Sequence, residues 1–144
     1  MKKVLFFIVI MGTVLVSILG CNKNTNLAFS KENLKNTNKK VKVFMDSFND
    51  KDGIYLYQFD SNYMYLFLNG YNTKDENRAL YFTDIKMEVK DETFIINFNE
   101  KSTDDYKNKD IANRVLYKIK RPKNIDTIKI YKNGEETHFD AILS

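Results

Sequence analysis

The chain has 144 residues, which is room for one domain. A composition of 43% hydrophobic and 14% aromatic residues is typical of a folding chain and excludes a disordered one. The formal charge of +4 becomes +2 if a cleaved N-terminal segment removes Lys2 and Lys3. Because lysines and acidic residues are interspersed over most of the chain, we predict no nucleic-acid partner.

The first 20 residues have the form of a secretory signal peptide. Met1, Lys2 and Lys3 form a positive start, and residues 4–19 carry no charge. This run of about 16 residues is shorter than the ~20 residues that a membrane-spanning helix needs. It also ends at Cys21 rather than in a basic stop-transfer cluster. We therefore predict a signal peptide over residues 1–20.

The four residues Ile18, Leu19, Gly20 and Cys21 resemble the lipobox of bacterial lipoproteins. That motif is an aliphatic residue, a small or aliphatic residue, Gly or Ala, and then Cys. The resemblance implies that the Cys21 thiol receives a diacylglyceryl group and that the chain is cut between Gly20 and Cys21. It also implies that the lipid bilayer is a partner, through acylated Cys21, at the outer face of the bacterial cytoplasmic membrane. The alternative is a signal peptide or an uncleaved signal anchor with a chance cysteine.

Residues 21–40 are dominated by Asn, Lys, Thr and Ser, and their few apolar residues form no face. We predict a flexible tether over this range, holding the domain on the order of 24 Å from the lipid. Its lysines could instead lie on anionic head groups. Cys21 is the only cysteine, so we expect neither a disulfide nor a metal site built on Cys.

A short helix is predicted at the start of the domain. Val41, Phe44, Met45 and Phe48 stand at the i, i+3, i+4 and i+7 positions of one helical face, and the pattern stops at Asn49.

The rest of the chain alternates with a period of two and is rich in β-branched and aromatic residues. It predicts about seven short strands: 54–59, 63–68, 79–90, a strand around 94–98, 111–120, a strand around 128–130, and a last strand whose Phe139 and Ile142 face inward. Asn133-Gly134 between two such runs predicts a hairpin. No crossover helix is present that would connect parallel strands. We therefore predict a single domain over residues 41–144 of the mainly β (α+β) class: a small antiparallel β-sandwich or barrel with one short N-terminal helix.

Residues 66–131 resemble the C-terminal domain of bacterial protease-stabilising lipoproteins. The likeness is a strand ending in Asn69-Gly70, a long strand from Tyr81 with a turn at Asp91, and a strand ending at Pro122. The Gly-Gly-Tyr signature of that family is absent, so the resemblance implies a topology only.

Tyrosines crowd the first two strands, at Tyr55, Tyr57, Tyr63 and Tyr65. Both faces of these strands are apolar or aromatic, so both need covering. In one interpretation, the core covers one face and the helix covers the other. In the other interpretation, the four tyrosines form an exposed patch that binds a protein, because tyrosine combines a large contact area with few rotatable bonds.

Residues for catalysis are sparse. His138 is the only histidine, no serine lies in a Gly-flanked elbow, and no Gly-rich phosphate loop is present. We predict no catalytic residue, no cofactor and no metal site. The resulting hypothesis is a membrane-anchored extracytoplasmic lipoprotein that acts as a non-enzymatic protein-binding module. The alternatives are a cell-envelope ligand-binding or exclusion module that contacts cell-wall polymer or peptide, and a small hydrolase.

Overall fold

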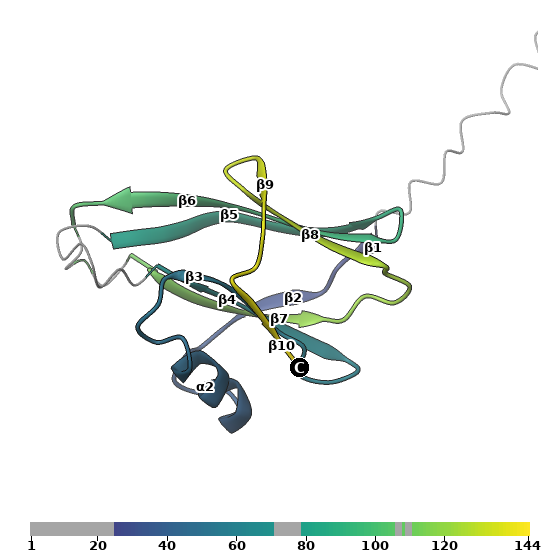
Figure 1. Cartoon of the computed structure of the whole chain (residues 1–144), viewed down its shortest axis with the longest axis horizontal. Coiled ribbons are helices and arrows are strands. Elements are labelled where there is room, and N and C mark those ends of the chain that lie inside the picture. The colour runs from purple at the N-terminus through teal and green to yellow at the C-terminus, as the bar shows by residue number, and fades with distance from the viewer. Residues whose placement is uncertain (1–24, 71–78, 106–107, 109–110) are drawn as a thin grey trace, which may run out of the picture.

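The computed structural model describes residues 25–70, 79–105, 108 and 111–144. These residues form two five-stranded β-sheets that lie face to face, with a helix outside one of them (Figure 1). The predicted mainly β, α+β fold is confirmed, as two sheets rather than a closed barrel.

The first sheet, here the β5–β6 sheet, has the order β1-β5-β6-β8-β9. Its strands are β1 (Thr25–Asn26), β5 (Ala79–Lys90), β6 (Thr93–Thr103), β8 (Thr127–Lys132) and β9 (Glu135–Thr137). The second, here the β3–β4 sheet, has the order β10-β3-β4-β7-β2. Its strands are β2 (Phe29–Glu32), β3 (Gly53–Tyr57), β4 (Tyr63–Asn69), β7 (Arg114–Lys120) and β10 (Ala141–Leu143).

The main core lies between the two sheets. Because successive side chains of a strand point to opposite faces, every second residue of β3 and β4 enters this core. Those residues meet the inward face of the β5–β6 sheet. The buried members of the core include Leu56, Met64, Leu66, Leu68, Met87, Phe94, Ile96, Phe98 and Ile130.

A second core lies on the outer face of the β3–β4 sheet, where the predicted helix packs. The helix α2 (Lys39–Asp46) places Val41, Phe44 and Met45 against this face. Its first turn is capped by the Asn38 side chain, which accepts a hydrogen bond from the Lys40 amide at 2.8 Å. The helix prediction is confirmed.

Two strand predictions are confirmed in detail. The bounds of β5 agree with the predicted range, and a tight turn joins β8 to β9. In this turn Asn133 and Gly134 have φ values of 53° and 84°, as a two-residue hairpin of type I′ requires.

The strand β5 also contains a bulge that the alternation pattern does not reveal. The register with β6 shifts between Thr83 and Lys86, and Asp84 has a φ of 55°. The extra residue shifts the alternation of side chains between the two faces of the sheet by one position. Phe82 and Met87 therefore both face the core, although five positions separate them.

The predicted flexible tether is wrong for part of its length. Strand β1 pairs with β5, and Phe29 to Glu32 pair with β7 from Ile119 to Leu116. Each of these strands gains backbone hydrogen bonds from a long neighbour, so neither needs a hydrophobic pattern of its own. The folded part thus begins by Thr25 rather than at residue 41, and the predicted 24 Å spacing no longer applies.

The purely antiparallel prediction is also wrong in two places. Strand β8 runs parallel to β6, and β10 runs parallel to β3. Parallel neighbours need a crossover, and β7, which lies in the opposite sheet, provides it between β6 and β8.

Of the two residues predicted to face inward near the end of the chain, one is packed against the core and the other is exposed. Phe139 packs against the main core as predicted. Ile142 is 54% exposed, because β10 is the edge strand of its sheet, and this part of the prediction is wrong.

Candidate functional site

The predicted tyrosine patch is mostly a packed layer under the helix. Tyr55 and Tyr65 are 3% and 5% exposed, and Tyr57 packs against the same cluster. The Tyr55 ring stacks on Phe48 with centroids 4.0 Å apart. Burial raises the pKa of both Tyr55 and Tyr65. The binding-patch interpretation is therefore wrong for these two residues, and the covering-helix interpretation is confirmed.

Tyr63 stands apart from this layer. It begins β4 and lines a depression together with Lys118, whose ammonium nitrogen lies 4.2 Å from the centre of the Tyr63 ring. This distance is typical of a cation–π contact. Tyr63 thus lies at a surface depression rather than in the packed layer under the helix.

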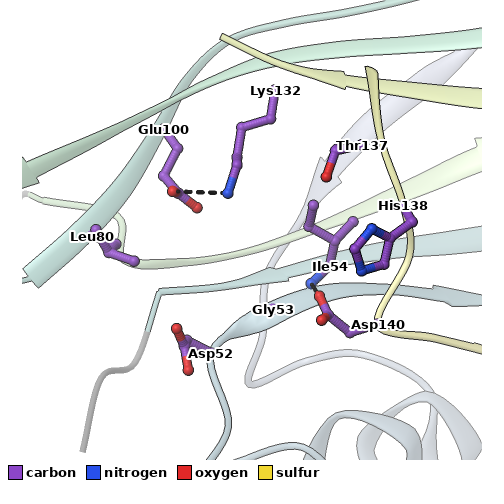
Figure 2. Close-up of a pocket in the computed structure, with 9 residues that line it drawn as sticks. All are labelled: Asp52, Gly53, Ile54, Leu80, Glu100, Lys132, Thr137, His138 and Asp140. Carbon is purple, nitrogen blue, oxygen red and sulfur yellow. Dashed lines mark hydrogen bonds and ion pairs between the residues drawn. The ribbon is translucent and has the colours of Figure 1, made fainter. Parts of the chain in front are cut away.

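A small polar pocket lies where the ends of several strands meet. Its volume is about 200 Å³. Figure 2 shows its nine lining residues: Asp52, Gly53, Ile54, Leu80, Glu100, Lys132, Thr137, His138 and Asp140. They come from both sheets and from the segment between β9 and β10. Because the pocket gathers residues from distant parts of the chain, no local motif could have predicted it.

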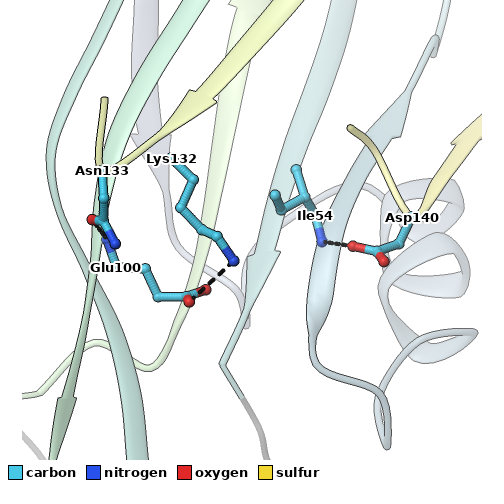
Figure 3. Close-up of polar contacts among 5 residues, drawn as sticks. All are labelled: Ile54, Glu100, Lys132, Asn133 and Asp140. Carbon is cyan, nitrogen blue, oxygen red and sulfur yellow. Dashed lines mark hydrogen bonds and ion pairs between the residues drawn. The ribbon is translucent and has the colours of Figure 1, made fainter. Parts of the chain in front are cut away.

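Hydrogen bonds fix two sides of this pocket (Figure 3). On one side, the Ile54 amide donates to the Asp140 carboxylate at 2.7 Å, and the Asp140 amide donates to the Ile54 carbonyl at 2.8 Å. This reciprocal pair ties the segment before β10 to the start of β3. A hydrogen bond to a charged acceptor is worth about 1.5–3 kcal/mol, so Asp140 has a structural role.

On the other side of the pocket, Lys132 and Glu100 form an ion pair at 3.2 Å, and the Glu100 amide donates to the Asn133 side chain at 2.9 Å. The two charged side chains are 37% and 23% exposed. A pair of this kind adds only about 0–1 kcal/mol to stability. The charges remain available to a ligand at little cost to the fold.

The chemistry of the pocket is that of a charged recess. It carries three carboxylates, of Asp52, Glu100 and Asp140, against the ammonium group of Lys132. Sequence reasoning did not single out these four residues. Within the described residues, no hydrogen bond joins the His138 imidazole to Asp140 or Thr137, so a nucleophile–base–acid chain is not assembled there. Among the same residues, no group of three or more His, Cys, Asp and Glu side chains could hold a metal ion.

Gly53 is expected to be the least replaceable residue of the pocket wall. A Cβ atom there would lie 2.7 Å from the Tyr55 hydroxyl and 2.8 Å from the Asp140 carboxylate. The Tyr55 ring cannot move aside easily, because it is stacked on Phe48 and its hydroxyl donates to the Asp52 carbonyl at 3.1 Å. We expect Gly53→Ala to lower the free energy of unfolding by roughly 1–3 kcal/mol from this crowding.

Gly134→Ala is the control, since Gly134 also has a positive φ, of 84°, but no atom within 4 Å of a new Cβ. It should lose only the stability that a residue with a Cβ atom loses in a left-handed backbone conformation, about 1 kcal/mol. Urea unfolding of both variants measures the difference, and equal losses would show that the wall around Gly53 is loosely packed.

The predicted lipidation and cleavage residues, Cys21 and Gly20, lie outside the described residues. In the part of the chain that the structure describes, no helix has the length and apolar character needed to cross a membrane. The sequence matches no protein-family model and no curated protein, and the fold matches no solved structure.

Proposed function

We propose that this protein is a lipoprotein anchored through acylated Cys21 at the outer face of the bacterial cytoplasmic membrane. We further propose that its folded part binds a protein partner without catalysing a reaction. The anchor is supported by the uncharged run of residues 4–19 and the Ile18-Leu19-Gly20-Cys21 sequence that follows it. The binding role is supported chiefly by the position and charge of the polar pocket.

The pocket lies far from the end of the domain where the chain enters. Leu80, the second residue of β5, lines the pocket, and β5 ends beside Thr25, which pairs with Val89. The nine steps from Leu80 to Val89 span about 30 Å at ~3.3 Å per residue. In Figure 1, β1 accordingly lies at the end of the β5–β6 sheet opposite the start of β5. An anchor before Thr25 would thus leave the pocket open to partners away from the membrane.

The size of the pocket favours a side chain over a free ligand. Pockets for small molecules and cofactors usually have volumes of about 300–1,000 Å³. At about 200 Å³, this pocket is smaller. Recesses that receive one side chain from a partner are common at the centres of protein interfaces.

The net charge of the pocket indicates that the side chain it receives is basic. The carboxylates of Asp52, Glu100 and Asp140 and the ammonium of Lys132 together carry a net charge of −2. A lysine or arginine of the partner complements this charge, and an arginine can form paired hydrogen bonds with a carboxylate.

Crosslinking in intact cells tests the proposal. A photo-reactive side chain at Thr137, on the pocket wall, should capture one protein partner, whereas the same group at Glu88, on the exposed face of β5, should not. Capture of cell-wall polymer or a short peptide at Thr137 would favour the ligand-binding alternative. Equal capture from both positions would contradict a specific site.

A pair of charge-neutralising variants tests the role of the carboxylates. We expect Asp52→Asn to reduce the yield of the Thr137 crosslink about tenfold or more, because the basic group of the partner loses its counter-charge. Glu88→Gln removes the same charge from a solvent-exposed position and should leave the yield unchanged. Similar yields from both variants and the unchanged protein would rule out recognition by charge.

A further inference from the structure

The end of the domain where the chain enters carries two adjoining depressions, called here the basic end surface. They share Ala28 and Lys120 and have volumes of about 410 Å³ and 330 Å³. The larger has the apolar residues Leu27, Val89 and Pro122 in its wall. The smaller has the aromatic rings of Phe29 and Tyr63.

Four cationic side chains surround these apolar groups. Lys120, Arg121 and Lys123 line the larger depression, and Lys118 and Lys120 line the smaller. Among the described residues, no carboxylate lines either depression. Apolar and aromatic groups ringed by lysines match a membrane–water interface, where aromatic rings sit at head-group level and lysine ammonium groups reach outward.

The backbone holds this surface in place. The Lys120 amide donates to the Ala28 carbonyl at 2.9 Å, which joins the end of β7 to the chain before β2. The Arg121 amide donates to the Asn62 carbonyl at 2.7 Å, and its guanidinium lies 3.4 Å from the Gln58 side-chain oxygen. Arg121 therefore braces the surface, whereas Lys120 and Lys123 are exposed and available to a partner.

The short segment between Cys21 and Thr25 indicates that the membrane is the partner of this surface. Cys21 precedes Thr25 by four residues, which span at most ~14 Å when fully extended. Thr25 pairs with Val89, and Val89 lies in the wall of the larger depression. An acyl chain on Cys21 would thus keep the basic end surface within reach of lipid head groups. This step depends on the proposed function, specifically on the lipid anchor.

We propose that the basic end surface docks onto the anionic phospholipid head groups of the membrane that holds the anchor. The turn between β5 and β6 lies at the same end and carries Asp91 and Glu92, which head groups repel. The side with β2 and β7 therefore faces the bilayer, and the polar pocket points away from it. Docking fixes the orientation of the domain, which a lipid anchor alone would leave free to rotate.

The test uses the full acylated protein in two kinds of vesicle, phosphatidylglycerol mixed with phosphatidylcholine and phosphatidylcholine alone. Lysines are labelled with an amine-reactive ester and quantified one by one. We expect Lys120 and Lys123 to be labelled several-fold less in the anionic vesicles, and Lys39, Lys40 and Lys42 on α2 to be labelled equally in both. Raising the salt from about 0.01 M to about 1 M, which shortens the Debye length from about 30 Å to about 3 Å, should abolish the difference.

Matched variants separate a defined surface from general attraction. Lys118→Gln/Lys120→Gln should lower the ratio of docked to undocked protein about fivefold per charge, read from the labelling of Lys123. Lys39→Gln/Lys40→Gln removes equal charge from α2 and should have no effect. Equal effects of the two variants, or protection centred on α2, would overturn the proposal.

The amount of protein that floats with the vesicles reports on the anchor separately. A chain that floats with neither vesicle contradicts the lipid anchor and, with it, this choice of partner. A chain that floats with both, while Lys120 and Lys123 are labelled equally in both, contradicts the docking surface alone.

Discussion

Replacing Phe67 by alanine is expected to lower the free energy of unfolding by about 3–5 kcal/mol. Phe67 is fully buried on the outer face of β4, under α2. Its ring centre lies 6.2 Å from that of Phe44 and 6.1 Å from that of Tyr55, and the Arg114 guanidinium lies 5.5 Å from it. Alanine would leave a cavity at the centre of the second core, since three neighbours lose a contact at once.

The loss of stability in Phe67→Ala should also be visible locally, in the helix α2. With eight residues, α2 is shorter than the ~12–15 that an isolated helix needs, so packing on the β3–β4 sheet holds it in place. We expect Phe67→Ala to increase the rate of amide hydrogen exchange more in α2 than in β6, because β6 lies in the other sheet. Urea unfolding followed by tyrosine fluorescence measures the global effect, because the chain has nine Tyr and no Trp.

Phe29→Ala is the matched control, as it removes the same ring from a site that is 37% exposed on the edge strand β2. The aromatic contact that would be lost is the edge-on one with Tyr117, at 5.9 Å. The cost should be about 1 kcal/mol or less. Equal losses from the two variants would mean that α2 does not pack tightly on the sheet.

The parts of the fold that were predicted correctly depend on local chemistry. The stripe of Val41, Phe44 and Met45 commits its segment to a helix. Asn133-Gly134 commits its neighbours to a hairpin because both residues tolerate a positive φ. The double apolar face of β3 and β4 required a cover on each side, and α2 and the β5–β6 sheet supply these covers.

The parts that were missed depend on partners far along the chain. Residues 29–32 carry little apolar pattern and are ordered by the backbone of β7, about 90 positions away. The sequence predicted Asn69 only as the end of a strand, whereas its buried side-chain amide donates to the carbonyls of Phe48 at 2.8 Å and Lys51 at 2.7 Å. Such roles appear only once the chain is folded.

The candidate sites show the same division. Tyr55 and Tyr65 were recognised as unusual for the right reason, their apolar surroundings, but composition could not decide between burial and exposure. The polar pocket combines residues from Asp52 to Asp140, and no spacing rule connects them. A sequence motif can predict chemistry when its residues are neighbours in the chain, as in the lipidation proposed at Gly20-Cys21, and it cannot do so when only the fold makes them neighbours.

Changing Cys21 to serine is expected to remove the protein from the membrane completely. Only a thiolate is nucleophilic enough here to accept the lipid, so serine leaves residue 21 without acyl chains. Each buried methylene contributes about 0.8 kcal/mol, so two long chains far exceed the roughly 1 kcal/mol per basic residue that the basic end surface supplies. Partitioning between detergent and water should place the unchanged protein in the detergent and Cys21→Ser in the water, while Asn22→Ser behaves like the unchanged protein.

High salt distinguishes the acyl anchor from the docking surface, when detergent partitioning is compared with labelling on vesicles. The unchanged protein should stay with the detergent at high salt, because an acyl anchor is not screened, whereas docking of Lys120 and Lys123 on anionic vesicles should be lost. If Cys21→Ser remained with the detergent and the intact mass of the unchanged protein showed a free thiol, residues 4–19 would be an uncleaved signal anchor. The apolar run, which ends at Leu19, would then hold the basic end surface near the bilayer through six residues that span at most ~22 Å.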